Sequence, residues 1–456
     1  MLRTGYKQFL LSKWKKIISL RLNPPQILVL GFAVLILAGA LLLFLPHASR
    51  TGQYTSFLTA LFTATSAVCV TGLVVVDTGT YWSTFGQVVI LFLIQIGGLG
   101  FMTMATFFFI LMGRYIGLRE RLLIQESLNQ LSLAGVVRLA RAVLIFTFFT
   151  EGFFACILAL RWVFDYGWST GWWFGLFHAV SAFNNAGFDL FGHFRSLTAY
   201  TSDATVTFSV TTLIILGGIG FAVVAEIFKN NRKKYISVHT RLVFLSTVLL
   251  IGSGMFFFAL LEWHGVLAEL SWSGKLLASY FQAVTPRTAG YNTVEIGQLR
   301  AATQFFLILL MFIGASPGST GGGIKTTTFS LLVLSVLSLV RGKEEVEVFR
   351  RRLPAQQVYK ALAILFLAAI IIITITLILS IIEKADFLAL LFETTSAFGT
   401  VGLSTGITPH LSAAGRILII LTMFIGRLGP LTLTFALAQR RQKVSLRYPE
   451  EKIMIG

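Results

Sequence analysis

Cysteine and charge are both scarce in this sequence, and each scarcity excludes a class of protein. The 456 residues include two cysteines, Cys69 and Cys156, both within apolar stretches, so a disulfide-stapled secreted fold is excluded. Charged residues make up 12% of the chain, against roughly 25% in a soluble domain. Hydrophobic residues make up 55%. The composition is therefore that of a membrane protein with several spans.

Recognisable catalytic and nucleotide motifs are lacking as well. We find no paired carboxylates and no histidine-rich metal spacing, so we do not expect an enzyme. A phosphate-binding loop over 318–323 would need Lys where Ile324 stands. No nucleotide-binding module follows the last apolar stretch, so nucleotide control is expected from another chain. We expect no cofactor in this chain.

The positive charges are arranged in a way that predicts orientation. Lys and Arg number 37 against 19 Asp and Glu, which gives a net charge of +18. The basic clusters adjoin apolar stretches, where the positive-inside rule places them, so no nucleic-acid partner is expected. Both termini are predicted to be cytoplasmic. The clusters lie at 13–21, 114–141, 229–241, 341–352 and 440–446.

Apolar stretches of two lengths alternate along the chain. A spanning helix needs about 20 mostly apolar residues, so shorter stretches do not cross. The long stretches lie at 27–45, 84–112, 139–163, 204–228, 241–261, 303–340 with an interruption, 358–382 and 412–437. The short ones lie at 56–68, 172–184, 274–285 and 387–398. The order long, short, long predicts an all-α membrane protein with four tandem helix–pore-loop–helix repeats around one pseudo-four-fold pore.

One motif recurs in the four short stretches and confirms the repeat within the sequence. It reads LFTATSAVCVTGL at 61–73, LFHAVSAFNNAGF at 176–188, FQAVTPRTAGY at 281–291 and LFETTSAFGTVGL at 391–403. Each copy has an early aromatic residue, a central Ser or Thr, and a glycine followed by an apolar residue. The glycines are Gly72, Gly187, Gly290 and Gly402, separated by 115, 103 and 112 residues. A second glycine-rich patch follows each of them by 24 to 30 residues.

The turns that end these motifs have the properties of a cation pore. Non-helical backbone at membrane depth is tolerated where it lines a water-filled cavity. Converging half-helix C-termini present partial negative charge, and carbonyls of a glycine-containing turn can replace a cation's hydration shell. The turns lack carboxylates, which favours a monovalent ion. A single glycine of this kind is equally explained by helix packing, but four in register favour the pore. The predicted ligands are the carbonyls of Val70, Thr71, Gly72, Leu73, Asn185, Ala186, Gly187, Phe188, Thr288, Ala289, Gly290, Tyr291, Thr400, Val401, Gly402 and Leu403.

Five segments carry a resemblance to a known family. They are VTGLVVVDTGT at 70–80, FNNAGF at 183–188, TPRTAG at 285–290, FGTVGL at 398–403 and FIGRLGP at 424–430. Over nearly its whole length the sequence resembles the Trk/Ktr/HKT potassium transporter superfamily, most closely the KtrB-type membrane subunits of bacterial Ktr systems. The resemblance implies a filter glycine for potassium in all four loops. Some plant relatives have Ser in the first loop and favour sodium, so Gly72 favours potassium.

A glycine-rich stretch interrupts the sixth long segment. Residues 314–328 read GASPGSTGGGIKTTT and cannot remain helical. One interpretation is a hinge, and the other is a loop that closes the pore beneath the filter. The resemblance implies the second, an intramembrane gating loop in contact with Arg427, a charge at membrane depth. The predicted gating residues are Gly314, Ser316, Pro317, Gly318, Gly321, Gly322, Gly323, Lys325 and Arg427.

The expected function is potassium uptake across the bacterial plasma membrane through a channel-like filter. The resemblance further implies a homodimer, a cytoplasmic ring of KtrA-type nucleotide-binding subunits, contact with membrane lipid, and Na+ as a candidate activator beside the transported K+. The alternative is a secondary transporter of another monovalent cation or solute, which has broken helices but not four equivalent loops. The predicted boundaries are a cytoplasmic segment at 1–26, repeats at 27–138, 139–239, 240–352 and 353–438, with the gating loop at 314–328, and a cytoplasmic tail at 439–456.

Three polar residues within apolar stretches have roles that the sequence leaves open. Glu151 is expected to pair with a basic group. His178 is expected to be a packed, hydrogen-bonded residue rather than a ligand. Glu393 is either structural or a weak attractor of cations.

The predicted orientation can be tested by labelling. In a variant without the two native cysteines, Lys233→Cys should react with an impermeant thiol reagent in inverted vesicles but not in intact cells, because its basic cluster is predicted to be cytoplasmic. Permeabilised cells control for accessibility. Labelling from outside intact cells would contradict the topology.

Overall fold

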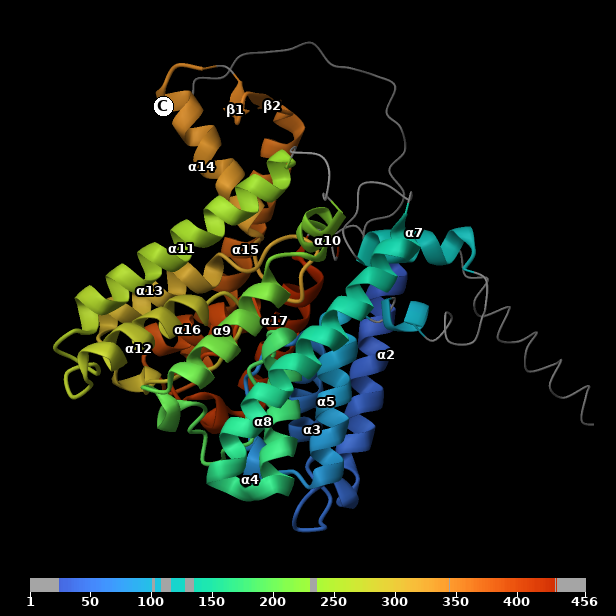
Figure 1. Cartoon of the computed structure of the whole chain (residues 1–456), viewed down its shortest axis with the longest axis vertical. Coiled ribbons are helices and arrows are strands. Elements are labelled where there is room, and N and C mark those ends of the chain that lie inside the picture. Colours follow the sequence, from blue (N-terminus) through green and yellow to red (C-terminus); the bar gives the residue numbers. More distant parts are fainter. Residues whose placement is uncertain are drawn as a thin grey trace, which may run out of the picture.

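The computed structural model of the protein describes residues 24–100, 103–107, 116–127, 135–229, 236–343 and 345–430, together with Thr432. The described chain is built almost entirely of helices (Figure 1). The predicted tail at 439–456, nearly all of the N-terminal segment at 1–26, and residues 230–235 of the third basic cluster lie outside the described residues.

The first two repeats each contain an outer helix, a short helix, a loop and an inner helix. The first comprises α2 (Pro24–Phe44), the 3-10 turn η1 (Pro46–Ala48), α3 (Phe57–Cys69), α4 (Thr78–Tyr81) and α5 (Thr84–Leu99), followed by the connecting helix α7 (Leu118–Ser127). The second comprises α8 (Val136–Phe183), η2 (Thr198–Tyr200), α9 (Ala204–Gly218) and α10 (Phe221–Lys229). Helix α8 contains both the outer and the short helix of this repeat. The two parts are separated by a kink at Gly167, which has a φ of 79°.

The last two repeats follow the same order. The third comprises α11 (Val238–Glu262), α12 (Trp272–Val284), η3 (Ile296–Gln298), α13 (Ala301–Phe312) and α14 (Thr326–Val340). The fourth comprises α15 (Ala355–Ile382), α16 (Phe387–Gly399), η4 (Thr408–His410) and α17 (Ala413–Leu428). Between them lies an antiparallel hairpin of β1 (Val346–Val348) and β2 (Arg351–Leu353), which the sequence did not predict.

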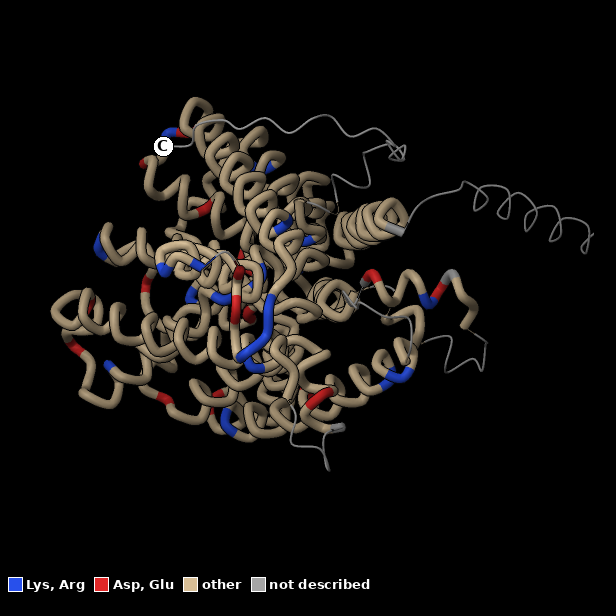
Figure 2. The backbone as a smooth tube through the Cα atoms, turned by 90° about the horizontal axis from the view of Figure 1, so that it is seen from above, with Lys and Arg blue, Asp and Glu red and all other residues tan. Residues whose placement is uncertain are grey.

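The outer helices face the lipid. Among the described helices, four are long and apolar enough to cross a membrane alone: Pro25–Phe44, Val136–Phe183, Val238–Glu262 and Ala355–Ile382. Large apolar side chains on them are exposed, such as Phe149, Phe256 and Ile381. Charged residues are sparse along the backbone tube, as Figure 2 shows from above. The chain is therefore a membrane protein with several spans.

The inner helices break at their glycine-rich patches. Helices α9 and α10 are bent by 94° relative to each other, so the predicted continuous span at 204–228 is wrong. Gly220 lies at this bend with a φ of 99°, and Gly100 and Gly429, with φ of 79° and 82°, directly follow the ends of α5 and α17. Such left-handed residues end a helix. The third repeat differs in the length of its break, which spans 313–325.

The repeats pack around a common axis in cyclic order. Each inner helix contacts the short helix of the next repeat: α5 contacts α8, α9 contacts α12, α13 contacts α16, and α17 contacts α3. The last of these contacts closes the ring. The early aromatic residue of each motif is fully buried in this arrangement; the four are Phe62, Phe177, Phe281 and Phe392.

Close glycine contacts hold each inner helix against the end of its own short helix in three repeats. A Cβ on Gly97, Gly217 or Gly426 would collide with a carbonyl oxygen four residues before the glycine of the recurring motif. Those carbonyls belong to Val68, Phe183 and Phe398 respectively. Small residues of this kind let membrane helices approach closely.

We therefore expect Gly217→Ala to destabilise the protein by about 2 kcal/mol, because its Cβ would overlap the carbonyl oxygen of Phe183. Gly252→Ala on α11 is the matched control, since no atom lies within 4 Å of its added Cβ and Ala favours a helix. Melting temperatures in one detergent measure both. Equal melting temperatures for the two variants would refute the close-packing argument.

Candidate functional site

Four loops leave the C-terminal ends of the short helices. We call residues 70–73, 185–188, 288–291 and 400–403 pore loops 1 to 4. Their first residues have left-handed φ: Val70 56°, Asn185 59°, Thr288 73° and Thr400 49°. Their third residues do too: Gly72 90°, Gly187 70°, Gly290 79° and Gly402 92°. The second and fourth residues do not, so left-handed φ recurs at every other residue of each loop.

Three of the left-handed first residues are β-branched. For Val70, Thr288 and Thr400 this conformation is a true outlier, because the side chain crowds the backbone. Such strain costs about 1–3 kcal/mol per residue and persists where the surrounding structure imposes it, most often at functional sites. The strain recurs at one position of the repeat, which indicates a functional backbone geometry.

The third residues of the pore loops form a closed ring. A Cβ added to any of these glycines would collide with the carbonyl oxygen that precedes the glycine of the next loop. The pairs are Gly72 with Ala186, Gly187 with Ala289, Gly290 with Val401, and Gly402 with Thr71. Each loop touches the next, and the fourth touches the first. The four loops therefore surround one axis with approximate four-fold symmetry.

The central Ser or Thr of each motif fixes its pore loop. In repeats 1 and 4 the hydroxyl oxygen accepts from a glycine N–H: Ser66 from Gly72 at 3.1 Å and Ser396 from Gly402 at 3.0 Å. In repeats 2 and 3 the hydroxyl donates to a carbonyl: Ser181 to Phe188 at 2.9 Å and Thr285 to Tyr291 at 2.5 Å. The repeat motif signalled these residues, but not the loop atom that each would reach.

Within the described residues, two of the sixteen predicted ligand carbonyls accept hydrogen bonds from the protein. The carbonyl of Phe188 accepts from the Ser181 hydroxyl and from the Tyr291 hydroxyl, the latter at 2.9 Å. The carbonyl of Tyr291 accepts from Thr285. In pore loops 2 and 3 these bonds fix the fourth residue of each loop.

The break segment, residues 313–325, lies directly beneath the pore loops. The N–H of Gly322 donates to the Thr400 hydroxyl at 3.1 Å, and a Cβ on Gly321 would collide with the Thr288 hydroxyl. The hydroxyl of Thr320 donates to the carbonyl of Phe183 at 3.2 Å. The segment thus reaches the bases of three of the four pore loops.

The break segment and the break in the second repeat satisfy each other's backbone groups. Ser316 N–H donates to Gly218 O at 3.0 Å, and Thr320 N–H donates to Gly217 O at 3.1 Å. In return, Gly318 O accepts from the N–H of Phe221 at 2.8 Å. Buried backbone groups that a helix leaves unpaired need such partners.

Internal bonds give the break segment its shape. Gly314 N–H donates to Ile324 O at 2.8 Å, and the Ser316 hydroxyl lies 2.9 Å from that of Thr326. The ammonium of Lys325 donates to Gly321 O at 2.6 Å. Gly318 and Gly323 have left-handed φ within this segment. A Cβ built on Gly220 would lie 2.6 Å from Pro317 O, so the segment also packs closely against the bend of the second repeat.

Arg427 connects the break segment to the first repeat. Its guanidinium donates to the carbonyls of Thr320 and Gly97, and to that of Gly98 at 3.2 Å. A planar, permanently charged group with five donors can bond several carbonyls at once. Arg427 thus joins the first, third and fourth repeats at one point.

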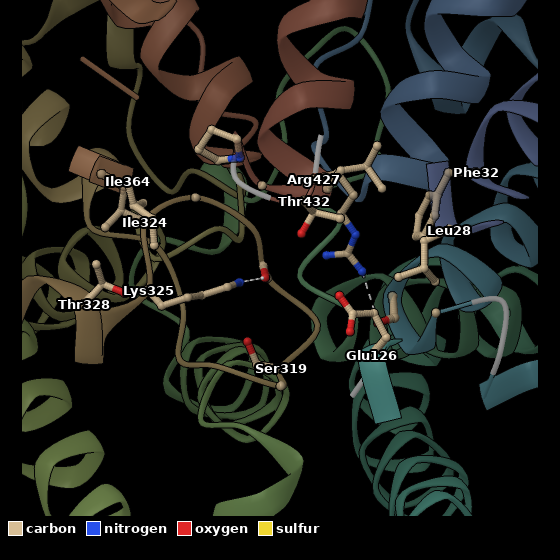
Figure 3. Close-up of a pocket in the computed structure, with 18 of the residues that line it drawn as sticks. Leu28, Phe32, Glu126, Ser319, Ile324, Lys325, Thr328, Ile364, Arg427 and Thr432 are labelled. Carbon is tan, nitrogen blue, oxygen red and sulfur yellow. Dashed lines mark hydrogen bonds between the residues drawn. The ribbon is translucent and has the colours of Figure 1, made fainter. Parts of the chain in front are cut away.

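A cavity of about 270 Å³ adjoins the break segment (Figure 3). The side chains of Lys325 and Arg427 reach into it from opposite sides, and Glu126 of α7 lies on the side of Arg427. Pore-loop residues are not part of its lining. The break segment therefore separates this cavity from the ring of loops.

Glu151 pairs with two amides, so the predicted basic partner is wrong. Its carboxylate accepts from Asn184 at 2.9 Å and from Gln95 at 3.2 Å, and its side chain is buried. Within the described residues, no Lys, Arg or His forms an ion pair with it. Asn184 directly precedes pore loop 2, so the cluster anchors that loop to α5 and α8.

Comparison with known proteins identifies the family. A family model described as a cation transport protein, TrkH, matches residues 4–446. The chain belongs to the TrkH family of cation transport proteins. The predicted resemblance is thereby confirmed, and the TrkH family is one of transporters rather than enzymes.

TrkH-family relatives align over nearly the whole chain. The Ktr system potassium uptake protein B of Bacillus subtilis is 48% identical, with 98% of this chain and 100% of that protein aligned. The potassium/sodium uptake protein NtpJ of Enterococcus hirae is 40% identical, with 97% and 99% aligned. The crystal structure of the potassium transporter TrkH from Vibrio parahaemolyticus matches with a TM-score of 0.72 at 21% identity, over 92% of this chain and 86% of that one. This match confirms the predicted fold.

Proposed function

We propose that this chain takes up potassium through the axis of the pore-loop ring. The closed ring of four glycines carries the proposal, since it brings the backbone carbonyls of four loops around one axis without a carboxylate among them. The names of the relatives support it, because the Bacillus protein is called a potassium uptake protein and the Enterococcus protein a potassium/sodium uptake protein. A secondary transporter of another solute would not need such a ring.

Selectivity follows from the contact between neighbouring loops. A dehydrated cation exchanges water for carbonyls, and the half-helix C-termini add partial negative charge. The glycines already touch the next loop, so the ring cannot contract around the smaller sodium ion without backbone collision. The carbonyls of the first three residues of each loop are the proposed ligands, and in loops 1 and 4 also those of Leu73 and Leu403.

The break segment is the proposed gate. It lies across the base of the ring and is held there by Arg427, while the Lys325 and Arg427 charges face the cavity below and disfavour a cation in it. Most of its residues are small, so displacing it exposes little apolar surface. A gate is expected among segments with few buried apolar contacts.

The wider assembly is part of the same proposal. The Bacillus relative is named as protein B of a system, which supports further components, and we propose a homodimer bound to a cytoplasmic ring of KtrA-type nucleotide-binding subunits. The name of the Enterococcus relative supports a role for Na+ as activator or second ion. We propose a location in the plasma membrane with both termini cytoplasmic, and repeat boundaries at 27–138, 139–239, 240–352 and 353–438.

The filter can be tested by ion competition in proteoliposomes. Gly72→Ser and Gly402→Ser should lower the ratio of potassium to sodium flux about tenfold, since a Cβ displaces the carbonyl of the adjoining loop. Gly152→Ser is the control, because a Cβ there meets no atom within 4 Å. An unchanged ratio in single Ser variants of all four ring glycines would exclude the carbonyl filter.

The gate can be tested by flux without any partner. Deleting residues 316–323 should raise potassium flux through purified protein, and Arg427→Ala should raise it about threefold by removing the hydrogen bonds of a charged donor to Thr320. Arg416→Ala is the matched control on the same helix, since its bonds go to Leu411 and Pro409 at the far end of α17.

Gel filtration verifies that each gate variant is folded. If the folded deletion variant conducts at the wild-type rate or not at all, the segment is not a plug, and the hinge interpretation replaces it.

A further inference from the structure

One position in the short helices is polar in all four repeats and buried in each of them. It lies nine residues before the ring glycine, or eight in the shorter third motif. The residues are Thr63, His178, Gln282 and Glu393, with exposures of 1%, 0%, 0% and 0%. Burying such groups is unfavourable unless they are hydrogen-bonded, so their partners indicate their role.

In repeats 2 and 3 this side chain bonds to the chain just beyond the pore loop. His178 Nδ1 lies 2.7 Å from the carbonyl of Phe174, which can only accept, so Nδ1 carries the hydrogen. Its Nε2 is then free to accept from the N–H of Leu190, at 3.3 Å. His178 is thus packed and hydrogen-bonded, as the sequence predicted. Gln282 donates to the Thr293 hydroxyl at 3.4 Å. Leu190 and Thr293 each lie three residues after their ring glycine.

Repeat 4 has the strongest version of this contact. One carboxylate oxygen of Glu393 accepts from the Ser404 hydroxyl at 2.8 Å, and the other accepts from the Thr408 hydroxyl. Hydrogen bonds to a carboxylate are about twice as strong as neutral ones. Within the described residues no basic group pairs with Glu393. Two hydroxyls therefore hold both of its oxygens.

Repeat 1 lacks the contact. Among the residues that the structure describes, the buried hydroxyl of Thr63 has no hydrogen-bond partner. Repeat 1 therefore serves as an internal control for the other three.

We propose that Glu393 is a positioning residue for ion selectivity, which acts by fixing the outer end of pore loop 4. Ser404 lies two residues after Gly402, so the bond from Glu393 sets where the loop leaves the ring. Gly402 in turn contacts pore loop 1, whose own short helix provides no such bond. Glu393 therefore supports both loops, while His178 and Gln282 support loops 2 and 3. This inference rests on the proposed function of the ring as a potassium filter.

The test compares Glu393→Ala, Glu393→Gln and Thr63→Ala by potassium/sodium flux ratios in proteoliposomes, with melting temperatures measured alongside. Glu393→Ala should lower the ratio about fivefold, the effect expected from losing hydrogen bonds to a charged group. Glu393→Gln should keep most of the ratio, because an amide accepts from one hydroxyl and donates to the other. Thr63→Ala should leave the ratio unchanged.

Further variants separate the possible failures. If Glu393→Ala does not fold, Ser404→Ala decides, since it removes one hydroxyl and leaves Thr408 on the carboxylate; a lower ratio supports the proposal and a wild-type ratio overturns it. A wild-type ratio in folded Glu393→Ala overturns it too, as does a Gln variant as unselective as the Ala variant. Gly402→Ser distinguishes failure of the positioning role from failure of the proposed carbonyl filter. If Gly402→Ser lowers the potassium/sodium flux ratio while Glu393→Ala does not, only the positioning role of Glu393 fails. If neither changes the ratio, the filter itself is wrong.

Discussion

The membrane interior offers no water, so every non-helical backbone group within it must find its partner in the protein. This chain places four pore loops, a broken inner helix and a 13-residue break segment (313–325) at that depth. The break segment forms backbone hydrogen bonds with the facing ends of α9 and α10. Arg427 donates hydrogen bonds to carbonyls of two repeats. Central Ser and Thr hydroxyls do the same for the loops. The geometry of the pore loops and of the break segment is thus set largely by the hydrogen bonds that their non-helical backbone groups require.

The four-fold repeat could be predicted because the spacing of its glycines and of its long and short apolar stretches is nearly constant, although the side chains differ between the copies. Short stretches predicted at 56–68 and 387–398 are α3 (Phe57–Cys69) and α16 (Phe387–Gly399) in the structure. Hydropathy and glycine position suffice for such elements, since length decides whether a helix spans and glycine marks where it must turn.

Contacts between distant residues were beyond the sequence. Glu151 bonds to Gln95 and Asn184, which lie 56 and 33 residues away, and nothing in an apolar run signals an amide partner. The bend at Gly220 was missed because glycines in a helical patch fit close packing equally well. Its cause is the neighbouring break segment, whose Gly318 carbonyl accepts from Phe221. The local sequence pattern shows where a glycine lies in the chain, but it does not show the backbone conformation that a segment distant in sequence imposes on it.

The glycine ring has no end, and this constrains how the four repeats can diverge. A side chain on any one ring glycine would push a carbonyl of the next loop, whose own glycine presses on the one after. A change in one quarter of the chain is therefore felt in all quarters. Residue type varies more outside the ring. One equivalent buried position is Thr63, His178, Gln282 and Glu393 in the four repeats. The four repeats can thus differ at this buried position but not at the glycines through which they touch one another in a circle.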